Sequence, residues 1–478
     1  MKHSLETFTK FIIGFVPRPV KEYLKQYAVL KECPREFWLI QLINFFESAG
    51  YFAIIFTLAI YLNENLGVAD DTSQKVAGTW LALISVAVFC SGSLVDALGI
   101  KKSLRIAALL NFVGRVLLAS LAYLGLSNHS MFVLVIAALA LQGLGYGFMQ
   151  PLMSAAVRRY TSKEGSRSAG FSLWYTTMQL GAIPALFLLD ILRATVGLAG
   201  VFVMAAIVNG IYLILTMFVK QEAQVGKEDE EAEADKKRNP LGIMWELFKT
   251  SHFWRFMAFM VILIGIRMTY AFAYLVMPKY YLRVLGEDAL IGTLSNINPI
   301  LIAVGLVVLT PVFAKFKTMT MLLVGMTIAV GSVFILALPV DTRNVFGLGI
   351  GGWYLLIIVA QIMAFAVSEM IWSPRLQEYT ANVAPKGREG AYQGCSLLPT
   401  FLSKTLVGWI SGYFFVNYCP ETELREKIEA GLVTYWQSPE AMWFWLGLIV
   451  STSLVLTFVF LRWIPKEAKK KEVEPATV

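Results

Sequence analysis

The sequence has little of three things that soluble enzymes use freely: charge, histidine and cysteine. Only 15% of the 478 residues are charged, against roughly a quarter in an average soluble domain, and 57% are hydrophobic. The three histidines lie outside the long apolar segments or at their edges, which argues against a buried haem or a di-iron site. No nucleophile–base pair or metal-ligand cluster stands out. We therefore expect a membrane protein that is not an enzyme and uses no metal or cofactor.

The four cysteines indicate no disulfide framework. We expect Cys33 on the cytosolic side, Cys90 and Cys395 inside apolar segments, and Cys419 alone in an outer loop. The first 36 residues also lack the pattern of a signal peptide. Their apolar run around residues 11–16 is short, and no small-residue cleavage site follows it.

Long apolar stretches fill most of the chain. A helix needs about 20 residues to cross a bilayer core of roughly 30 Å. The pattern predicts twelve such helices, at residues 37–62, 76–97, 103–126, 131–157, 167–192, 198–219, 253–278, 289–314, 318–339, 352–378, 391–416 and 440–463. The expected fold class is an all-α membrane protein of twelve transmembrane helices.

The positions of the basic residues predict the orientation. With both termini inside, the inner segments hold 31 of the 41 lysines and arginines, the outer loops hold seven, and three lie in the membrane. Inner loops are the ones that carry such an excess. We expect a multi-pass protein of the plasma (inner) membrane with both termini cytoplasmic. The net charge of +8 is therefore no sign of nucleic-acid binding.

The charged stretch at residues 221–250 divides the chain into two halves. We expect a cytosolic N-terminal segment at 1–36, six-helix bundles at 37–220 and 251–464, and a basic cytosolic tail at 465–478. Aromatic and basic residues mix in the N-terminal segment, which is typical either of an in-plane amphipathic helix or of an ordinary solvated tail. We expect a monomer in the lipid bilayer.

The two halves share sequence features at similar offsets. Phe37-Trp38 at the start of the first helix corresponds to Phe253-Trp254 at the start of the seventh, and Pro151 corresponds to Pro374. Four such matches fall at offsets between 216 and 223 residues. This indicates a duplicated six-helix unit, the parallel-repeat plan of major facilitator transporters.

The loop after the second predicted helix resembles the G-x-x-x-D-x-x-G-x-K/R signature of the major facilitator superfamily. Its matching residues are Gly92, Asp96, Gly99, Lys101 and Lys102. Glycine permits close helix approach and tight turns. An aspartate here can accept hydrogen bonds across the domain interface. We expect these residues to form a latch that breaks in the opposite conformational state.

Five charged side chains lie deep in the predicted membrane segments: Glu47, Arg115, Arg267, Glu369 and Lys404. A charge at bilayer depth costs at least roughly 2.5–3.5 kcal/mol, so such residues usually face a cavity and have a function there. The alternative is that they only pair with one another and hold helices together. For Arg115, bracing within the N-terminal half is the favoured interpretation.

Several segments resemble the proton-dependent oligopeptide transporter family of this superfamily. They are FSLWYTTMQLG at 171–181, Asn298-Pro299 with PVFA at 311–314, and SEMIWSP at 368–374 with APK at 384–386. The resemblance implies a solute site with Tyr175, Gln179, Asn298 and Glu369, and proton coupling at Glu369.

The first predicted helix departs from that family. NFFESAGY at 44–51 falls where the family has E-x-x-E-R-F-x-Y-Y, so Glu47 and Tyr51 match while Ser48 replaces the arginine. The family's lysine in the fourth helix is replaced by Gln150. A substrate carboxylate would then need Arg267, Arg115 or Lys404. Without a neighbouring cation, Glu47 becomes a second candidate for proton coupling.

The predicted function is secondary active transport of a small polar solute by alternating access, coupled to protons, with peptides or peptide-like compounds favoured. The candidate solute-binding residues are Tyr51, Gln150, Tyr175, Gln179, Arg267, Asn298, Glu369 and Lys404, and those for protons are Glu47 and Glu369. We expect the two carboxylates to line one central cavity. Two alternatives stay open: an antiporter that exports amphipathic compounds, and a membrane sensor or assembly factor that kept the fold and lost transport.

Overall fold

The computed structural model contains only helices and loops in the part of the chain that it describes. That part comprises residues 27–125, 127–161, 164–220, 247–313, 316–340, 347–385, 392, 395–420, 427–428 and 430–465. The expected N-terminal segment as far as residue 26, the linker from 221 to 246 and the tail from 466 lie outside the described residues.

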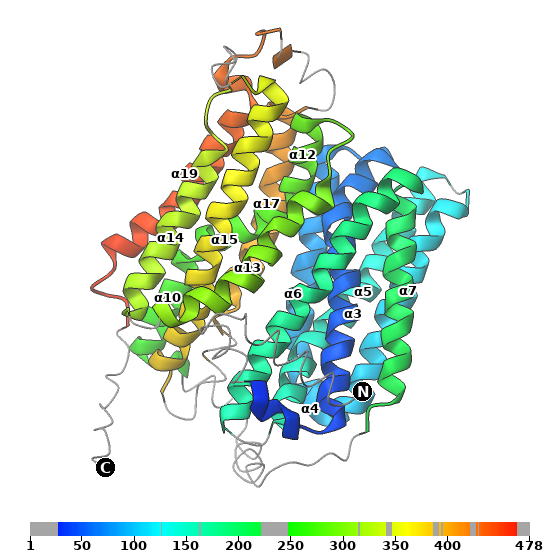
Figure 1. Cartoon of the computed structure of the whole chain (residues 1–478), viewed down its shortest axis with the longest axis vertical. Helices are drawn as coiled ribbons and strands as arrows, with labels where there is room; N and C mark the ends of the chain where they lie inside the picture. Colours follow the sequence, from blue (N-terminus) through cyan, green and yellow to red (C-terminus); the bar gives the residue numbers. More distant parts are fainter. Residues whose placement is uncertain are drawn as a thin grey trace, which may run out of the picture.

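The N-terminal half forms one group of helices, coloured from blue through cyan to green in Figure 1. In chain order its elements are η1 (Tyr27–Glu32), α3 (Arg35–Glu64), α4 (Asp70–Ser120), η2 (Leu121–Tyr123), α5 (Asn128–Tyr160), α6 (Glu164–Thr195) and α7 (Leu198–Met217). Helix α3 packs against α6 and α7, and its side chains are buried on nearly all sides from Ala49 to Leu62. A helix that is apolar all round is suited to such a central position.

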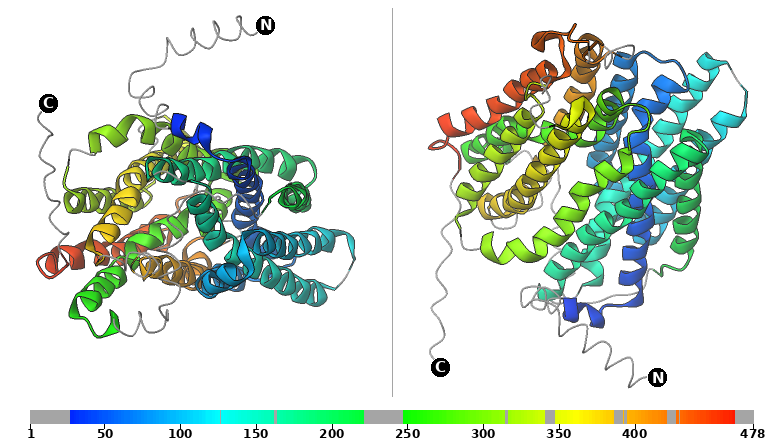
Figure 2. Two further views of the ribbon diagram at one scale, coloured as in Figure 1. Left: turned by 90° about the horizontal axis from the view of Figure 1, so that it is seen from below. Right: turned by 45° about the horizontal axis from the view of Figure 1, so that its top comes forward.

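The C-terminal half forms the second group, and Figure 2 shows the two groups side by side from other directions. Its elements are α10 (Ser251–Ile262), α11 (Ile264–Leu275), α12 (Met277–Leu285), α13 (Ile291–Phe313), α14 (Thr318–Ile335), α15 (Gly349–Val383), α17 (Leu398–Tyr418), η3 (Tyr435–Gln437) and α19 (Pro439–Val459). The chain is an all-α membrane protein of two helix bundles.

The expected spans agree with the observed helices. In the described part of the chain, nine helices are long and apolar enough to cross a membrane. The expected spans 76–97, 289–314 and 391–416 are not among the nine, yet α4, α13 and α17 make them largely helical. The exact number of twelve crossings stays a prediction.

Two expected spans run together as the single long helix α4, which bends at Gly99. This residue has φ 75° and ψ 162°, outside helical geometry. A positive φ is unfavourable for residues with a Cβ atom and open to glycine. The predicted turn at Gly99 is thus present. The side chains of residues 92–97, Asp96 among them, lie outside what is described.

The two halves meet most closely at one end of the bundle, which we call the distal end and define by Asn63, Asp70 and Arg283. Helix α4 crosses α17 there at two glycines, and a Cβ atom on Gly408 would lie 2.5 Å from the Cα of Gly78. Only backbone fits between the helices at this point. By the predicted orientation, the distal end faces outward.

Candidate functional site

A cavity of about 300 Å³ lies between the two halves. The N-terminal half lines it with Phe52, Phe56, Tyr175, Met178, Gln179, Ala182 and Leu186. The C-terminal half contributes Arg267, Tyr270, Ala273, Tyr274, Met277, Tyr281, Ser295, Asn298, Pro299, Gln361, Ile362, Phe365, Glu369, Ser373 and Gln377. Its size is at the lower end of pockets that hold small molecules.

Regular helical spacing positions the C-terminal wall. On α15, five cavity residues follow one another at intervals of four: Gln361, Phe365, Glu369, Ser373 and Gln377. On α11 and α12, the cavity residues Arg267, Tyr270, Tyr274 and Tyr281 are spaced by three, four and seven. These intervals place side chains on one helix face. Helices α15, α11 and α12 therefore turn polar and aromatic side chains toward the cavity.

Glu369 is held by neutral donors from both halves of the protein. Asn298 Nδ2 donates to Glu369 Oε2 at 3.1 Å, and the Tyr175 hydroxyl donates to Oε1 at 3.4 Å. Tyr175 belongs to α6 of the N-terminal half, so the second contact crosses the interface. No lysine or arginine nitrogen of the described residues lies within 4.0 Å of this carboxylate. Glu369 can therefore take up a proton or an ammonium group.

Arg267 is the cation that lines the same cavity. Its guanidinium carbon lies 4.6 Å from the ring centroid of Trp372 and 5.3 Å from that of Tyr270. Its buried Nε has no hydrogen-bond partner among the described residues. Aromatic faces attract a guanidinium and leave its N–H edge open to an acceptor.

Glu47 does not belong to the cavity with Glu369, contrary to the expectation from sequence. Arg115 Nη2 donates to Glu47 Oε1 at 2.9 Å, and the two side chains are only 2% and 5% exposed. The premise that Glu47 lacks a neighbouring cation is wrong, because α4 supplies one. Glu47 instead borders a separate space of about 10 Å³, and Met178 lies between that space and the cavity. The favoured bracing role of Arg115 agrees with this pair.

The structure brings together five of the predicted solute-binding residues: Tyr175, Gln179, Arg267, Asn298 and Glu369. Tyr51 does not line the cavity, since it is buried in a stack on Tyr146 with ring centroids 4.2 Å apart. Lys404 is not among the lining residues, and its Nζ lies 5.9 Å from the ring centroid of Tyr274. The side chain of Gln150 lies outside the described residues.

Sequence reasoning missed most of the aromatic lining. Phe52 and Phe56 are four residues apart on α3, and the three tyrosines follow Arg267 at helical spacing. The helical spacing of these tyrosines from Arg267 is the sequence signal that could have predicted them as lining residues. Tyr270 also shares a hydrogen bond with Ser373, with 3.1 Å between the two oxygens.

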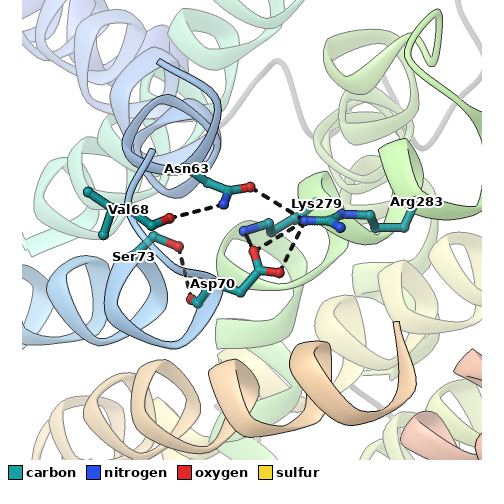
Figure 3. Close-up of polar contacts among 6 residues, drawn as sticks. All are labelled: Asn63, Val68, Asp70, Ser73, Lys279 and Arg283. Carbon is teal, nitrogen blue, oxygen red and sulfur yellow. Dashed lines mark hydrogen bonds and ion pairs between the residues drawn. The ribbon is translucent and has the colours of Figure 1, made fainter. Parts of the chain in front are cut away.

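A network of largely buried charged side chains joins the two halves at the distal end of the bundle (Figure 3). Asp70 at the start of α4 pairs with Lys279, and both carboxylate oxygens accept from Arg283 Nη2 at 3.2 Å. Arg283 also donates to the side-chain oxygen of Asn63 at 3.4 Å. The side chains of Lys279 and Arg283 are 3% and 7% exposed. This network joins α3 and α4 of one half to α12 of the other.

A second contact at the distal end joins α6 to α13. The Asp190 carboxylate accepts from the backbone nitrogens of Gly292 and Thr293, both at 2.7 Å. These nitrogens are at the start of α13, where helical N–H groups lack intrahelical partners. Arg193 on α6 adds an ion pair with Glu287 at 3.2 Å. Hydrogen bonds and ion pairs between described residues of the two halves concentrate at this end.

Comparison with known proteins identifies the family. The model of the Major Facilitator Superfamily matches residues 40–401, well over half of the chain. The protein therefore belongs to this superfamily of membrane transport proteins.

The particular proteins that it resembles are peptide permeases. It is 25% identical over 190 residues to dipeptide and tripeptide permease A of Pectobacterium carotovorum subsp. carotovorum (strain PC1). That match covers 39% of this chain and 36% of the relative. A similar match is to dipeptide and tripeptide permease B of Aliivibrio fischeri (strain MJ11), 25% identical over 187 residues and covering 39% and 36% of the two chains. The matches thus span little more than a third of these relatives' own length.

Solved structures of similar fold cover almost the whole chain. A POT family transporter in complex with 5-aminolevulinic acid superimposes with a TM-score of 0.69 at 16% identity, covering 91% of this chain and 97% of that one. A peptide transporter POT in complex with sulfate gives 0.67 at 17% identity, covering 90% and 94%. The shared fold is that of peptide transporters of the superfamily.

Proposed function

We propose that this protein is a proton-coupled transporter of small amino-carboxylate solutes, with short peptides as the favoured class. It works by alternating access between its two helix bundles, in the plasma (inner) membrane with both termini cytoplasmic. The observation that carries the proposal is the position of Glu369, which borders a solute-sized cavity and contacts both halves through Asn298 and Tyr175.

Glu369 can link the proton to the solute and to the conformation. A partly buried carboxylate that has only neutral donors gains from a proton or from the ammonium group of a solute. A proton on Glu369 turns the charge-assisted hydrogen bond from Tyr175 into a weaker neutral one, which weakens the contact between the halves. Coupling is assigned to Glu369 alone, because Arg115 already compensates the charge of Glu47.

The ion-pair network of Asp70, Lys279 and Arg283, called the distal network from here on, keeps the two halves together on one side in the proposed cycle. Asp70, Lys279 and Arg283 hold α4 against α12 on the predicted outer side. Opening that side separates Asp70 from both cations, while the inner side closes. This matches the hinge and rocking transitions of two-bundle transporters. Names of the relatives support the solute class, since they are permeases for dipeptides and tripeptides, and one structural neighbour holds the amino acid 5-aminolevulinic acid.

Uptake by the purified protein in proteoliposomes tests the proposal. A panel of labelled dipeptides, tripeptides and amino acids is offered with and without an imposed proton gradient. We expect at least one dipeptide to accumulate above the outside concentration when the outside is acidic, and to leak out when a protonophore is added. Uptake that ignores the proton gradient, or no uptake of any panel member above empty liposomes, would reject the proposal.

A further inference from the structure

Among the described residues, the charged side chains that line the cavity all belong to its C-terminal wall. Its charged lining residues are Arg267 and Glu369, which belong to α11 and α15. The N-terminal wall consists of two phenylalanines, apolar residues, Tyr175 and Gln179. The proposed solute therefore meets a charged wall on one side and an uncharged, largely apolar wall on the other.

The other two charged residues expected in the membrane as cations, Arg115 and Lys404, are not among the described residues that line this cavity. Arg115 is paired with Glu47 in the interior of the N-terminal half, at 2.9 Å and with almost no exposure. Lys404 contacts the ring of Tyr274, with its Nζ 5.9 Å from the ring centroid, and is not among the lining residues. Of these three cations, only Arg267 is among the described residues that line the cavity.

Arg267 is held in position but has no hydrogen-bond acceptor among the described residues. Two aromatic rings contact the guanidinium, Trp372 at 4.6 Å and Tyr270 at 5.3 Å. No carboxylate of the described residues lies within 4.0 Å of it, and its Nε is buried without a hydrogen-bond partner. A buried cation without a counterion is costly, so an anionic ligand is the natural complement. The planar guanidinium suits a carboxylate that accepts two parallel hydrogen bonds.

We infer that Arg267 binds the carboxylate of the transported solute, and that the N-terminal wall selects an apolar or aromatic group on it. The inference rests on the proposed function in one respect, that this cavity is the solute site. The solute class is a small amino carboxylate whose charged groups both contact the C-terminal half. Phe52 and Phe56 on the opposite wall then favour phenylalanine or leucine side chains over charged ones.

Equilibrium binding to the purified full-length protein in detergent tests the inference. The ligands are alanyl-phenylalanine, its C-terminal amide, and 3-phenylpropionate, which carries the ring and carboxylate without an amine. We expect the wild type to bind the free acid at least roughly tenfold more tightly than the amide, because charge-assisted hydrogen bonds are lost in the amide. We also expect it to bind 3-phenylpropionate.

Three variants separate the role of Arg267 from a general loss of charge. Arg267→Gln should bind acid and amide equally and should not bind 3-phenylpropionate. Arg267→Lys should restore part of the preference, since it keeps the charge but loses the planar fork. Lys404→Gln removes one positive charge from a residue that is not among the lining residues and should keep the full preference. Gel filtration and thermal unfolding check that each variant is folded.

The outcomes distinguish this inference from the proposed function. Equal binding of acid and amide by the wild type, or an unchanged preference in Arg267→Gln, overturns the assignment of Arg267 even if proton-driven uptake is observed. Arg267-dependent binding of 3-phenylpropionate without proton-driven uptake of any peptide supports the carboxylate site and rejects the transport proposal. If the wild type binds none of the three ligands, Arg267 does not anchor a carboxylate of this class.

Discussion

Arg115 and Glu47 form a closed ion pair inside the N-terminal half, with 2.9 Å between Nη2 and Oε1. The pair joins α4 to α3 and is almost inaccessible to solvent. Glu47 is not among the residues that line the cavity, and Glu369 is the carboxylate in that lining within the described part of the chain. In the N-terminal half, Glu47 and Arg115 therefore connect two helices. In the C-terminal half, Arg267 and Glu369 line the cavity.

We predict that breaking this pair destabilises the protein strongly. Arg115→Met leaves the Glu47 carboxylate buried without its partner, which should lower the free energy of unfolding by about 3–5 kcal/mol. The double variant Glu47→Gln, Arg115→Met should recover most of that loss, because no uncompensated charge remains. Thermal and denaturant unfolding in detergent measure the stability of both variants.

The control variant is Arg193→Gln, which breaks an ion pair whose Glu287 side chain is 81% exposed. This change should lower the free energy of unfolding only slightly. A double variant as unstable as Arg115→Met would contradict this account.

Much of the architecture follows from the sequence because its signals are local. Apolar length predicted the helices, and the glycine of the loop motif predicted the turn at Gly99. The motifs also identified Tyr175, Gln179, Asn298 and Glu369, which share one cavity because each lies on the inward face of its helix.

Pairings between distant helices could not be predicted in the same way. Glu47 was expected in the cavity because of its depth along the helix, but a helix that is apolar all round gives no indication of the direction in which a polar side chain points. Lys279 and Arg283 were counted only as outer-loop charges. Their four-residue spacing on one helix face was a signal, but their partner Asp70 is 209 residues from Lys279 in the chain and depends on how the halves assemble.

The distal network should control access to the cavity from its own side. Asp70→Asn leaves Lys279 and Arg283 without the carboxylate that joins them to α4, which favours separation of the halves. Cys419 offers a readout, since it is fully buried and lies one turn beyond Phe415, whose ring faces Lys279. In a background with Cys33, Cys90 and Cys395 changed to serine, maleimide labelling of Cys419 in detergent should accelerate roughly 5–30-fold for a shift of 1–2 kcal/mol.

The neighbouring Asp71 provides the matched control for that experiment. Its side chain is 40% exposed and pairs with Lys75 one turn along the same helix, and this hydrogen bond holds the pKa of the Asp71 carboxyl below its ordinary value. Asp71→Asn removes the same charge without contacting α12 and should leave the labelling rate of Cys419 unchanged. Equal labelling rates in the two variants would mean that Asp70 does not hold the distal end closed.

The glycine crossing of α4 and α17 should matter for the same closed state. Gly408→Ala places a methyl group 2.5 Å from the Cα of Gly78, so the helices must move apart at the distal end. We expect faster labelling of Cys419 and a lower melting temperature. Gly331→Ala is the control, because a Cβ atom on Gly331 in α14 meets nothing within 4 Å. A Gly408→Ala protein that labels and melts like Gly331→Ala would show that the crossing tolerates separation.

The central claim is that Glu369 couples the proton to the solute, and Glu369→Gln in proteoliposomes tests it most directly. The glutamine keeps the size of the side chain and a hydrogen-bonding oxygen but cannot release a proton. We predict that this variant loses accumulation of a transported dipeptide under an acid-outside gradient, yet still exchanges labelled for unlabelled dipeptide, while Glu47→Gln with Arg115→Met still accumulates it. A Glu369→Gln protein that concentrates the dipeptide as far as the wild type does would contradict the account.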